Sequence, residues 1–545
     1  MDIFFLIFFF AAILISSFSF ASSAGIAAVA CFFSLFFLVY LFISRKIKKL
    51  PAYSLIAVFI VSLTFLLSIL INSVDQLHSY ESLFLWSSYI LLFAVSTQIP
   101  LSEKKINLSI LLFVIACILL FALKLIFPAF LPFITASDRQ FILPSTGMHN
   151  HLGDIVGLGL ISVLLIISSS YLASIARLLF IPLIILSFTK SALLSLFVVL
   201  ILAGIAIKEK RENFLYTAFV LFYISIAAIM VFSLEFSTLS FVAPIQKYIQ
   251  SSFNISPKPL LSQRDIYAYQ TASFLFHSPI EYVGFGVGLG NFSYASSKTT
   301  DLEGKIIADP HNIFLTFLVE GGVVSLLWTA LFLSSVSYYG VKYKRNALFL
   351  FLYLLLLFQT DYVFQIPAFL FLFFFLAGQI VRVPRDDKSA LNLSDLGLWI
   401  SLLAFVGLVS FQSYSVKAQY ANAQTELTTT LKTNSITGID KSADTLQYLT
   451  PYNETLLIRL SSIYEAYRQE NRAISLLEKL LTFSPHSFIE NLPHLLKLKT
   501  AAKQNVSAYI RSVAPELRQI TVSYEEKVVL KSLCIKYASV VSCFK

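Results

Sequence analysis

The chain has 545 residues, of which 57% are hydrophobic and only 13% are charged. A soluble protein would carry about a quarter charged residues, so the composition excludes an ordinary soluble domain. The formal net charge of +10 does not indicate a nucleic-acid partner, because much of the excess lies in short clusters between apolar runs. The clusters are Arg45, Lys46, Lys48 and Lys49; Lys104 and Lys105; Lys208, Lys210 and Arg211; Lys342, Lys344 and Arg345; and Arg382, Arg385 and Lys388.

Repeated apolar runs of about 20 residues predict an all-α, polytopic bundle of about 12–13 transmembrane helices. The predicted spans are 3–20, 24–43, 52–72, 82–99, 108–128, 152–170, 175–189, 191–207, 213–233, 313–336, 346–360, 365–381 and 396–414. The basic clusters then fall in alternate loops, which makes those loops cytoplasmic. The outward loops are 73–81, 129–151, the turn around Lys190, 234–312 and 361–364.

The first apolar run, residues 1–25, resembles a signal peptide in its apolar core and its Ala-Ser-Ser-Ala end. A signal peptide usually begins with a positive charge, whereas this run carries Asp2. We therefore expect a first helix that is retained rather than cleaved. The orientation of the later helices does not depend on this choice.

Two polar regions accompany the predicted spans. The outward loop 234–312 is long for a connection between helices, and such loops are usually functional. It holds an amphipathic stretch, Ser262–Phe276, followed by a glycine cluster. After the last span, residues 415–545 become polar with a helical pattern. We therefore divide the chain into a membrane domain, 1–414, and a small extracytoplasmic helical domain, 415–545.

Part of the C-terminal region resembles the helix-turn-helix rhythm of tetratricopeptide repeats. The matching residues are Leu460, Tyr464, Ala473, Leu477, Leu480 and Pro485. One repeat is clear, whereas a stable array needs about three, so a small TPR-like helical domain is the prediction. Cys534 and Cys543 also lie here, and a disulfide between them is allowed if the region is extracytoplasmic.

The outward loops hold the residues best suited to chemistry. Asp309, Pro310, His311 and Asn312 end the long polar loop and open an apolar helix. Imidazole titrates near neutrality, and polar groups at a membrane boundary are costly unless they are used. The other candidates are Arg264, Asp265, the run Gly284–Asn291, Lys190 in a short outward turn, His149, Asn150 and His151.

Three of these segments resemble the O-antigen ligase and O-antigen polymerase family of bacterial membrane glycosyltransferases. The first is His311-Asn312-Ile-Phe-Leu with Glu320-Gly-Gly downstream, and the second is Arg264, its helix, Pro279 and the Gly-x-Gly run that ends in Asn291-Phe292. The third is the helix start at Asn150. Family members usually carry arginine where this chain has Lys190, which keeps the charge but loses the planar fork that matches phosphate oxygens.

The resemblance implies transfer of a glycan from a polyprenyl-pyrophosphate carrier to a hydroxyl or sugar acceptor. His311 would be the general base, while Arg264 and Lys190 would stabilise charge on the leaving pyrophosphate. No metal or other cofactor is implied, and a single inverting displacement fits. Substrate contacts are expected at Asn312, Asn150, His151, Gly286, Gly288 and Asn291, with Glu320 and Asp309 in supporting positions.

Each of these residues also has a structural interpretation. His311 could hydrogen-bond backbone at a helix N-terminus, Arg264 could begin a solvated helix face, and Lys190 could extend to the interface. The pair His149 and His151, with Asp154, suggests a metal site only weakly, because their spacing is poor on one helix face. The glycine run is not a nucleotide loop, since no strand precedes it and no Lys-Ser or Lys-Thr follows it.

The sequence thus predicts an enzyme of the cytoplasmic (inner) membrane with its site and C-terminal domain facing outward. Its expected partners are the lipid-linked glycan, a glycan, glycolipid or protein acceptor, the bilayer, and a protein bound through 415–545. Ligase activity is preferred over polymerase activity or protein O-oligosaccharyltransfer. The alternatives from other classes are a lipid-linked glycan transporter or flippase, which usually has interrupted helices and midplane charges, and a membrane-anchored scaffold.

Overall fold

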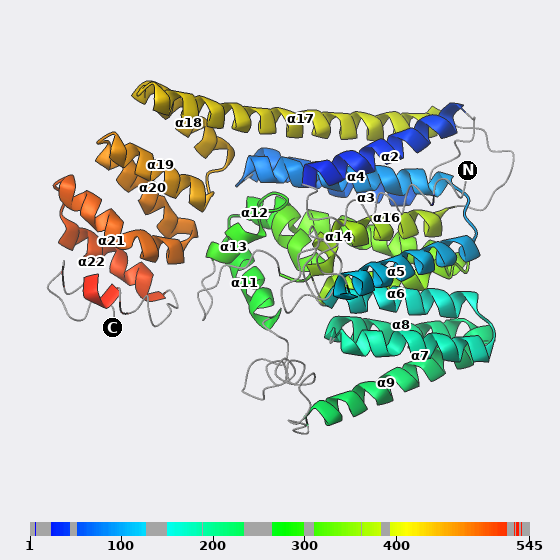
Figure 1. Ribbon diagram of the computed structural model, residues 1–545. Helices are drawn as coiled ribbons and strands as arrows, with labels where there is room; N and C mark the ends of the chain where they lie inside the picture. Colours follow the sequence, from blue (N-terminus) through cyan, green and yellow to red (C-terminus); the bar gives the residue numbers. More distant parts are fainter. Residues whose placement is uncertain are drawn as a thin grey trace.

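The computed structural model consists of helices joined by turns and loops (Figure 1). It describes residues 23–43, 52–72, 74–126, 150–187, 189–233, 264–298, 310–360, 362–382 and 393–519, with single positions or short pieces at 6, 528, 530–533 and 536. Within these ranges no β-strand is found, so the predicted all-α class is confirmed. The first predicted span, apart from Leu6, and both C-terminal cysteines lie outside the described residues.

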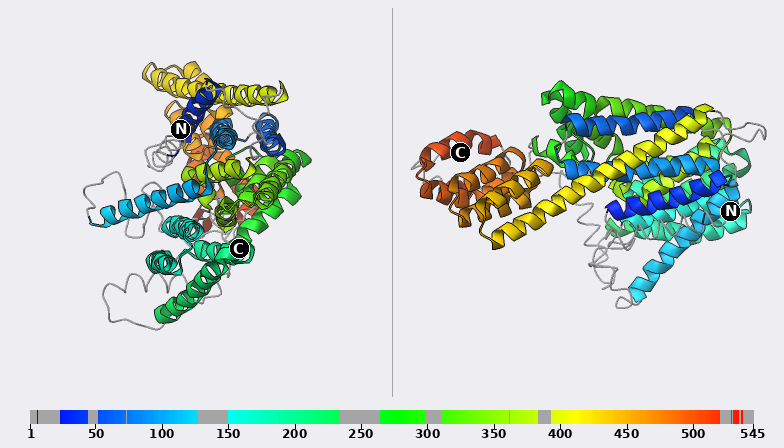
Figure 2. Two further views of the ribbon diagram at one scale, coloured as in Figure 1. Left: turned by 90° about the vertical axis from the view of Figure 1, so that its right-hand side faces the viewer. Right: turned by 90° about the horizontal axis from the view of Figure 1, so that it is seen from above.

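Each predicted span from 24–43 onward coincides with a helix. These helices are α2 (Ser23–Ile43), α3 (Ala52–Asn72), α4 (Gln76–Gln98), α5 (Glu103–Ile126), α6 (Asn150–Ile166), α7 (Ser170–Leu186), α8 (Lys190–Ala206), α9 (Arg211–Ser233), α14 (Ile313–Lys342), α15 (Ala347–Thr360), α16 (Pro367–Val381) and α17 (Leu393–Lys432). They lie roughly side by side in Figure 1, and some of them are seen end-on in Figure 2, left. This is a polytopic helical bundle.

By length and apolarity alone, three of the described helical segments can cross a membrane singly: Tyr53–Asn72, Ile313–Lys342 and Leu396–Lys432. The pair Lys190–Ala206 and Lys208–Ala227 also passes this test together, with a bend of 118° between its members. Several shorter apolar helices, such as those at 347–360 and 368–381, pack among them. The bend follows from chain reversal at the 3-10 turn Lys208–Lys210, which lets α9 fold back along α8.

The basic loops that the structure describes meet at one end of the bundle, here called the basic end. Glu103 accepts a hydrogen bond from the amide of Asn346 at 2.8 Å, and Arg345 donates to the carbonyl of Arg382 at 3.5 Å. Lys210 donates to carbonyls in the last turn of α6. Because distant basic clusters converge, the spans alternate in direction as the charge pattern predicts. The opposite end carries the candidate site and is called the site end.

The most unusual element is α14, which is broken at Gly322. This glycine has φ 69° and ψ −176°, which is not helical. The loop 286–288 lies against the break, where the amides of Val287 and Gly288 donate to the carbonyls of Val319 and Glu320, each at 3.0 Å. A Cβ at Gly322 would overlap the carbonyl of Gly284, so only glycine fits this approach. The predicted uninterrupted span 313–336 is therefore two half-helices joined by a glycine hinge.

The polar loop and the C-terminal region also form helices, all beyond the site end (Figure 1). The loop holds α11 (Arg264–His277), α12 (Ile280–Phe285) and α13 (Phe292–Lys298), and η2 (Tyr362–Gln365) joins α15 to α16. The C-terminal helices are α18 (Ile436–Leu449), α19 (Glu454–Ala466), α20 (Glu470–Phe483), α21 (Pro485–Ala501) and α22 (Val506–Gln519). The predicted boundary at 414/415 falls inside α17, which continues from the bundle into this domain (Figure 2, right).

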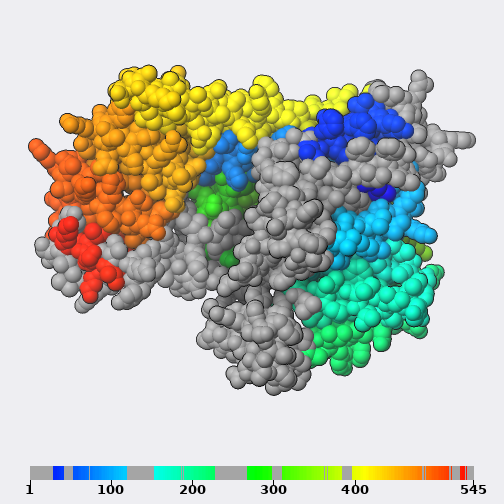
Figure 3. Space-filling view, in the orientation of Figure 1, coloured from blue at the N-terminus to red at the C-terminus, as the bar shows by residue number. Residues whose placement is uncertain are grey.

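The C-terminal domain has its own apolar core. Leu460, Tyr464, Ala473, Leu477 and Leu480, all singled out from the sequence, are buried in it. Pro485 occupies the first turn of α21, where proline is well tolerated. In the space-filling view the domain forms a lobe joined to the bundle along α17 (Figure 3). The helical nature of the domain agrees with expectation, while the tetratricopeptide resemblance stays a prediction.

Candidate active site

His311 is held in a constrained position directly before α14. Its φ of 52° lies in the left-handed region, which few non-glycine residues adopt outside turns and functional sites. The next residue, Asn312, is extended and caps α14, accepting from the amides of Phe314 and Leu315 at 2.9 and 3.1 Å. Its Nδ2 donates to the carbonyl of Gln359 at 3.2 Å. The capping role considered for His311 belongs to Asn312.

This geometry changes the role expected for Asn312. Both ends of its side-chain amide are used to fasten α14 to itself and to the end of α15. Asn312 therefore has a positioning role in the structure, and the substrate contact predicted from the sequence stays a prediction. Asn312 fixes the chain on one side of the imidazole of His311.

The other side of the imidazole is covered by α11. The rings of Tyr267 and His311 lie 5.4 Å apart and nearly perpendicular, an arrangement that aromatic pairs favour. Arg264 begins α11 three residues before Tyr267, a spacing that places the two positions on the same face of the helix. The side chain of Arg264 lies outside the described residues. Its backbone position nevertheless brings the predicted phosphate-binding cation to the neighbourhood of the predicted base.

Lys190 is the exposed first residue of α8. The preceding turn packs on the start of α6, since a Cβ at Gly153 would meet the hydroxyls of Ser187 and Thr189. Lys190 therefore lies beside the helix start at Asn150, where a third predicted segment begins. The side chains of Asn150 and His151 lie outside the described residues, as does Asp309 entirely.

The helix α15 connects these two groups of residues. The side chain of Tyr353 in α15 approaches Gly157 of α6. Seven residues before Gly157, α6 begins at Asn150, and seven residues after Tyr353, α15 ends at Thr360, so these two helix ends lie at the same level. The last turn of α15 also binds Asn312 through Gln359. Lys190 and His311 thus flank the end of α15. No described cavity is lined by both of them, so convergence on one cavity stays a prediction.

The electrostatics of the site end favour an anion. The helices α6, α8, α11 and α14 all begin there, and the N-terminus of a helix carries roughly half a positive charge. Lys190 and Arg264 stand at the first positions of α8 and α11, where a cation is disfavoured by about 0.3–1 kcal/mol. A bound phosphate group would turn both unfavourable placements into favourable ones.

The backbone amides of the glycine run donate to carbonyl groups of the protein itself, including two at the break of α14. The amide of Gly286 donates to Tyr282, and that of Gly288 to Glu320. Gly286 has φ 75°, and a Cβ there would overlap the backbone of Glu320 and Gly321. Both amides thus have partners within the protein, one in α12 and one at the break of α14, and a contact of Gly286 or Gly288 with substrate stays a prediction.

The buried side chains of Asn291 and Glu320 hold the glycine loop and the start of α13 in place. Glu320, 4% exposed, accepts a hydrogen bond from the amide of Phe292 at 3.1 Å and so fixes the start of α13. The Nδ2 of Asn291 donates to Ser79 of α4 at 2.7 Å and to the carbonyl of Val287 at 3.2 Å. Glu320 therefore supports the structure, as expected. Asn291 joins the glycine loop to α4 and also faces a cavity.

That cavity, of about 620 Å³, was not predicted from the sequence. Its wall combines the start of α4, the loop after the glycine run, the first half of α14 and the C-terminal domain. Its polar and aromatic lining includes Asp75, His78, Trp86, Tyr89, Asn291, Ser293, Tyr294, Thr316, Phe317, Glu320, Tyr452, Glu454 and Ser484. No local pattern could have shown it, because its lining comes from separate stretches of the chain, 74–89, 289–294, 316–320, 364–370 and 452–484.

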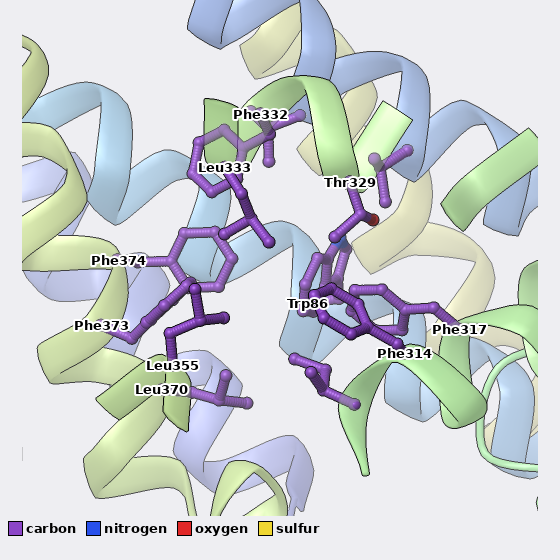
Figure 4. A pocket seen from close by; sticks show the side chains of 13 residues that line it. Trp86, Phe314, Phe317, Thr329, Phe332, Leu333, Leu355, Leu370, Phe373 and Phe374 are labelled. Carbon is purple, nitrogen blue, oxygen red and sulfur yellow. The ribbon is translucent and has the colours of Figure 1, made fainter. Parts of the chain in front are cut away.

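Beneath the cavity the bundle is filled by aromatic side chains. Figure 4 shows Trp86, Phe317 and Phe374 among the residues around a void of only about 20 Å³. The ring of Trp86 lies 5.2 Å from those of Phe317 and Phe374. Its lining is apolar apart from Thr329, whose hydroxyl donates to the carbonyl of Ser325. This packing closes the mid-section beneath the site end.

One buried arginine was not singled out from the sequence. Arg177 lies two turns inside α7, donates to Thr217 at 2.8 Å and to Asn213 at 3.2 Å, and stacks over Tyr216 at 4.7 Å. An arginine inside a membrane helix is often functional. Here its contacts fasten the middle of α7 to the first two turns of α9.

Comparison with known families gives one match. Residues 175–330 match the family model described as O-Antigen ligase. The matched range begins in α7 and includes Lys190, the whole glycine assembly, His311 and Glu320. A search of curated proteins found no match to the chain.

Proposed function

The chain belongs to the O-antigen ligase family, and from this premise we propose that it transfers a glycan from a polyprenyl-pyrophosphate carrier to an acceptor. The transfer takes place at the site end, which faces outward from the cytoplasmic membrane. The basic end then faces the cytoplasm, in agreement with the distribution of lysine and arginine. The membrane carrier delivers its pyrophosphate at the level where the bundle helices end.

The observation that supports this proposal most is the shared position of His311 and the two helix-initiating cations. Tyr267 holds the imidazole beside α11, whose first residue is Arg264. Lys190 lies across the end of α15. A titratable base next to an anion-binding set of helix starts suits a reaction whose leaving group is a phosphate ester.

In the proposed reaction the bond between the anomeric carbon and the pyrophosphate oxygen breaks. The electron pair goes to that oxygen, and the developing charge is stabilised by Arg264, Lys190 and the N-termini of their helices. The acceptor hydroxyl attacks the same carbon from the opposite face, and its proton passes to His311. A single displacement of this kind inverts the anomeric configuration and requires no metal, because the fixed cations neutralise the leaving group.

His311 is well placed for proton transfer. The residue is half-buried, and its Nδ1 atom is buried, so Nε2 is the candidate for the acceptor proton. Its left-handed backbone costs about 1–3 kcal/mol and is maintained by the Asn312 cap and by α11. Backbone strain of this size is typical of functional sites, where it sets the direction of a side chain at the expense of local stability.

Among the activities of this class, we prefer transfer of a whole glycan to an acceptor, as in a ligase. The C-terminal domain lies at the site end and forms part of a cavity wall next to α14. Polymerisation of lipid-linked repeat units and transfer to protein serine or threonine are the alternatives. They differ from the ligase only in the acceptor.

A transporter is disfavoured by two observations. The one break found in α14 is filled by the chain's own glycine loop, whereas transporters use such breaks to hold substrate. Below it, aromatic rings pack across the mid-section (Figure 4).

The test is transfer in proteoliposomes that contain the full chain and a lipid-pyrophosphate glycan donor. We expect His311→Ala to lower the rate about 10²–10⁴-fold. Arg264→Ala and Lys190→Ala should lower it about 10–10³-fold, and Lys190→Arg should restore activity. The matched control is Lys208→Ala, an exposed lysine beyond the other end of α8. It should transfer at the unmodified rate.

Two results would contradict the proposal. Unchanged transfer by both His311→Ala and Arg264→Ala would remove the proposed site. Movement of the lipid-linked glycan across sealed vesicles without formation of a glycosidic bond would favour the transporter.

A further inference from the structure

We propose that the cavity between the bundle and the C-terminal domain binds the carbohydrate part of the acceptor, a neutral or amine-bearing oligosaccharide. This inference rests on the proposed function and names the acceptor class of the same site. The cavity volume of about 620 Å³ falls within the range of roughly 300–1,000 Å³ that is typical of ligand sites. It is large enough for a few sugar units.

The charge of the lining excludes the anionic half of the donor. Among the described residues that line the cavity, none is lysine or arginine, while Asp75, Glu320 and Glu454 are acids. A pyrophosphate or a phosphorylated headgroup would meet these carboxylates without a compensating cation. Donor and acceptor are therefore separated by charge: the helix-initiating cations attract phosphate, and the cavity repels it.

The remaining lining matches a carbohydrate. Sugar rings have apolar faces that pack on aromatic rings and hydroxyl groups that bond to carboxylates, amides and hydroxyls. Tyr294 and Tyr452 approach each other at 4.8 Å across the two halves of the cavity. Glu454 accepts from Ser484 at 2.8 Å, which fixes one carboxylate toward the wall. Trp86 and Phe317 form an aromatic floor.

Tyr294 stays a hydrogen-bond donor over the whole physiological range. Burial, together with the neighbouring Tyr452 and Tyr282, raises the pKa of Tyr294 far above its ordinary value. Burial also raises the pKa of Asp75, although the amide of His78 donates to its carboxylate. Tyr294 therefore offers a hydrogen-bond donor, and Asp75 oxygen atoms, to the polar groups of a carbohydrate.

The cavity lies close to the proposed base. Thr316 lines it and donates to the carbonyl of Asn312 at 3.0 Å, one helical turn back toward His311. One turn of α-helix rises about 5.4 Å, which is comparable to the length of a single sugar ring. An acceptor seated between Tyr452 and Thr316 therefore presents its terminal hydroxyl in the direction of His311.

The polar contacts that join the C-terminal region to α4 are at least partly exposed. Gln76 donates to Tyr448 at 3.3 Å, and Lys417 pairs with Glu81 at 2.8 Å. Exposed contacts of this kind contribute little to stability. Tyr452 and Glu454 can therefore be changed to probe binding without unfolding the bundle.

The first experiment measures transfer to two soluble acceptors in proteoliposomes. One acceptor is the repeat-unit oligosaccharide released from the donor by mild acid, and the other is a serine-containing peptide. We expect Tyr452→Ala and Glu454→Gln each to raise KM for the oligosaccharide at least 10-fold. The kcat at saturation and KM for the lipid-linked donor should not change, and Tyr452→Phe should retain most binding. Unchanged KM for the oligosaccharide in both variants, or transfer only to the peptide, would overturn the proposal.

The second experiment does not require transfer, so it separates this inference from the proposed function. Ser293, exposed at the cavity rim, is changed to cysteine in a full chain whose four native cysteines are alanine. Millimolar oligosaccharide should slow maleimide labelling of Ser293→Cys at least 5-fold, and should leave Ser462→Cys, on the exposed face of α19, unaffected. Equal rates with and without oligosaccharide would reject the cavity as the acceptor site, even if transfer itself occurs.

Discussion

The two longest described helices, α14 and α17, are both largely apolar but have different structural roles. Both contain an apolar stretch that can cross a membrane. The 30 residues of α14 include a glycine pair and break at Gly322, whereas α17 runs for 40 residues without a recorded break. The broken helix holds the glycine loop, Glu320 and His311. The helix that positions the site, α14, is broken, whereas the helix that connects the two domains, α17, is continuous.

The largest expected difference between them comes from adding one methyl group. Gly322→Ala in α14 would place Cβ against the carbonyl of Gly284 and force a glycine-only conformation, so we expect a loss of about 3 kcal/mol or more. The matched change is Gly407→Ala in α17, where nothing lies within 4 Å. It should stabilise that helix by about 0.5–1 kcal/mol. Thermal unfolding in detergent measures both, and equal effects would mean that the break is not structural.

A smaller difference concerns buried and exposed glutamates. Glu320→Ala removes the acceptor of the Phe292 amide and should cost about 1–3 kcal/mol, with Glu320→Gln restoring most of it. Glu426→Ala on α17 removes an exposed pair with Lys441 and should change stability by less than about 0.5 kcal/mol. Hydrogen exchange at the start of α13 should rise only in Glu320→Ala. Faster exchange in the Glu426 variant would contradict this assignment.

A pH-dependent effect is expected at Asp75, beside the C-terminal domain. Its pKa is raised in the folded state, mainly by burial, so the folded protein binds this proton more tightly than the unfolded chain does. The stability contribution is complete below the unfolded pKa, about 4, and is lost as pH rises through the higher folded value. Asp75→Asn keeps the helix cap and should remove this decline. The measurement is Tm between pH 4 and 7; parallel curves for both proteins would refute it.

The smallest expected effect is the surface pair that ties α17 to α4. Lys417 and Glu81 lie 2.8 Å apart with partly exposed side chains. A double-mutant cycle should give at most about 1 kcal/mol, falling further in high salt. A larger, salt-insensitive value would mean that the two domains are joined more rigidly than these contacts indicate.

The sequence predicted those features that depend on local patterns. Apolar run length placed the helices from α2 to α17, and the basic clusters predicted which loops meet at the basic end. It also selected His311, Arg264 and Lys190, which the structure places at one end of the bundle. The break of α14 was not predicted, because two glycines can remain helical until another loop, here 286–288, approaches them.

Some roles depended on contacts that no spacing reveals. Asn312 was expected to bind substrate, but its cap and its bond to Gln359 arise from the packing of α15. The amides of Gly286 and Gly288 were expected to face substrate, but in the folded chain they donate to the carbonyls of Tyr282 in α12 and of Glu320 at the break of α14. The cavity depends on residues from α4 and from the C-terminal domain that meet only in the folded chain.

The continuity of α17 has a further, mechanical consequence. A helix of 40 residues is about 60 Å long and turns as one body. A tilt of about 5° at its membrane end would displace its far end by about 5 Å, and bilayer thickness is one of the forces that sets helix tilt. Tyr452 and Glu454 follow α18, which packs against α17 and therefore moves with it. A change in the thickness of the lipid around the bundle therefore changes the tilt of α17 and, with it, the width of the cavity.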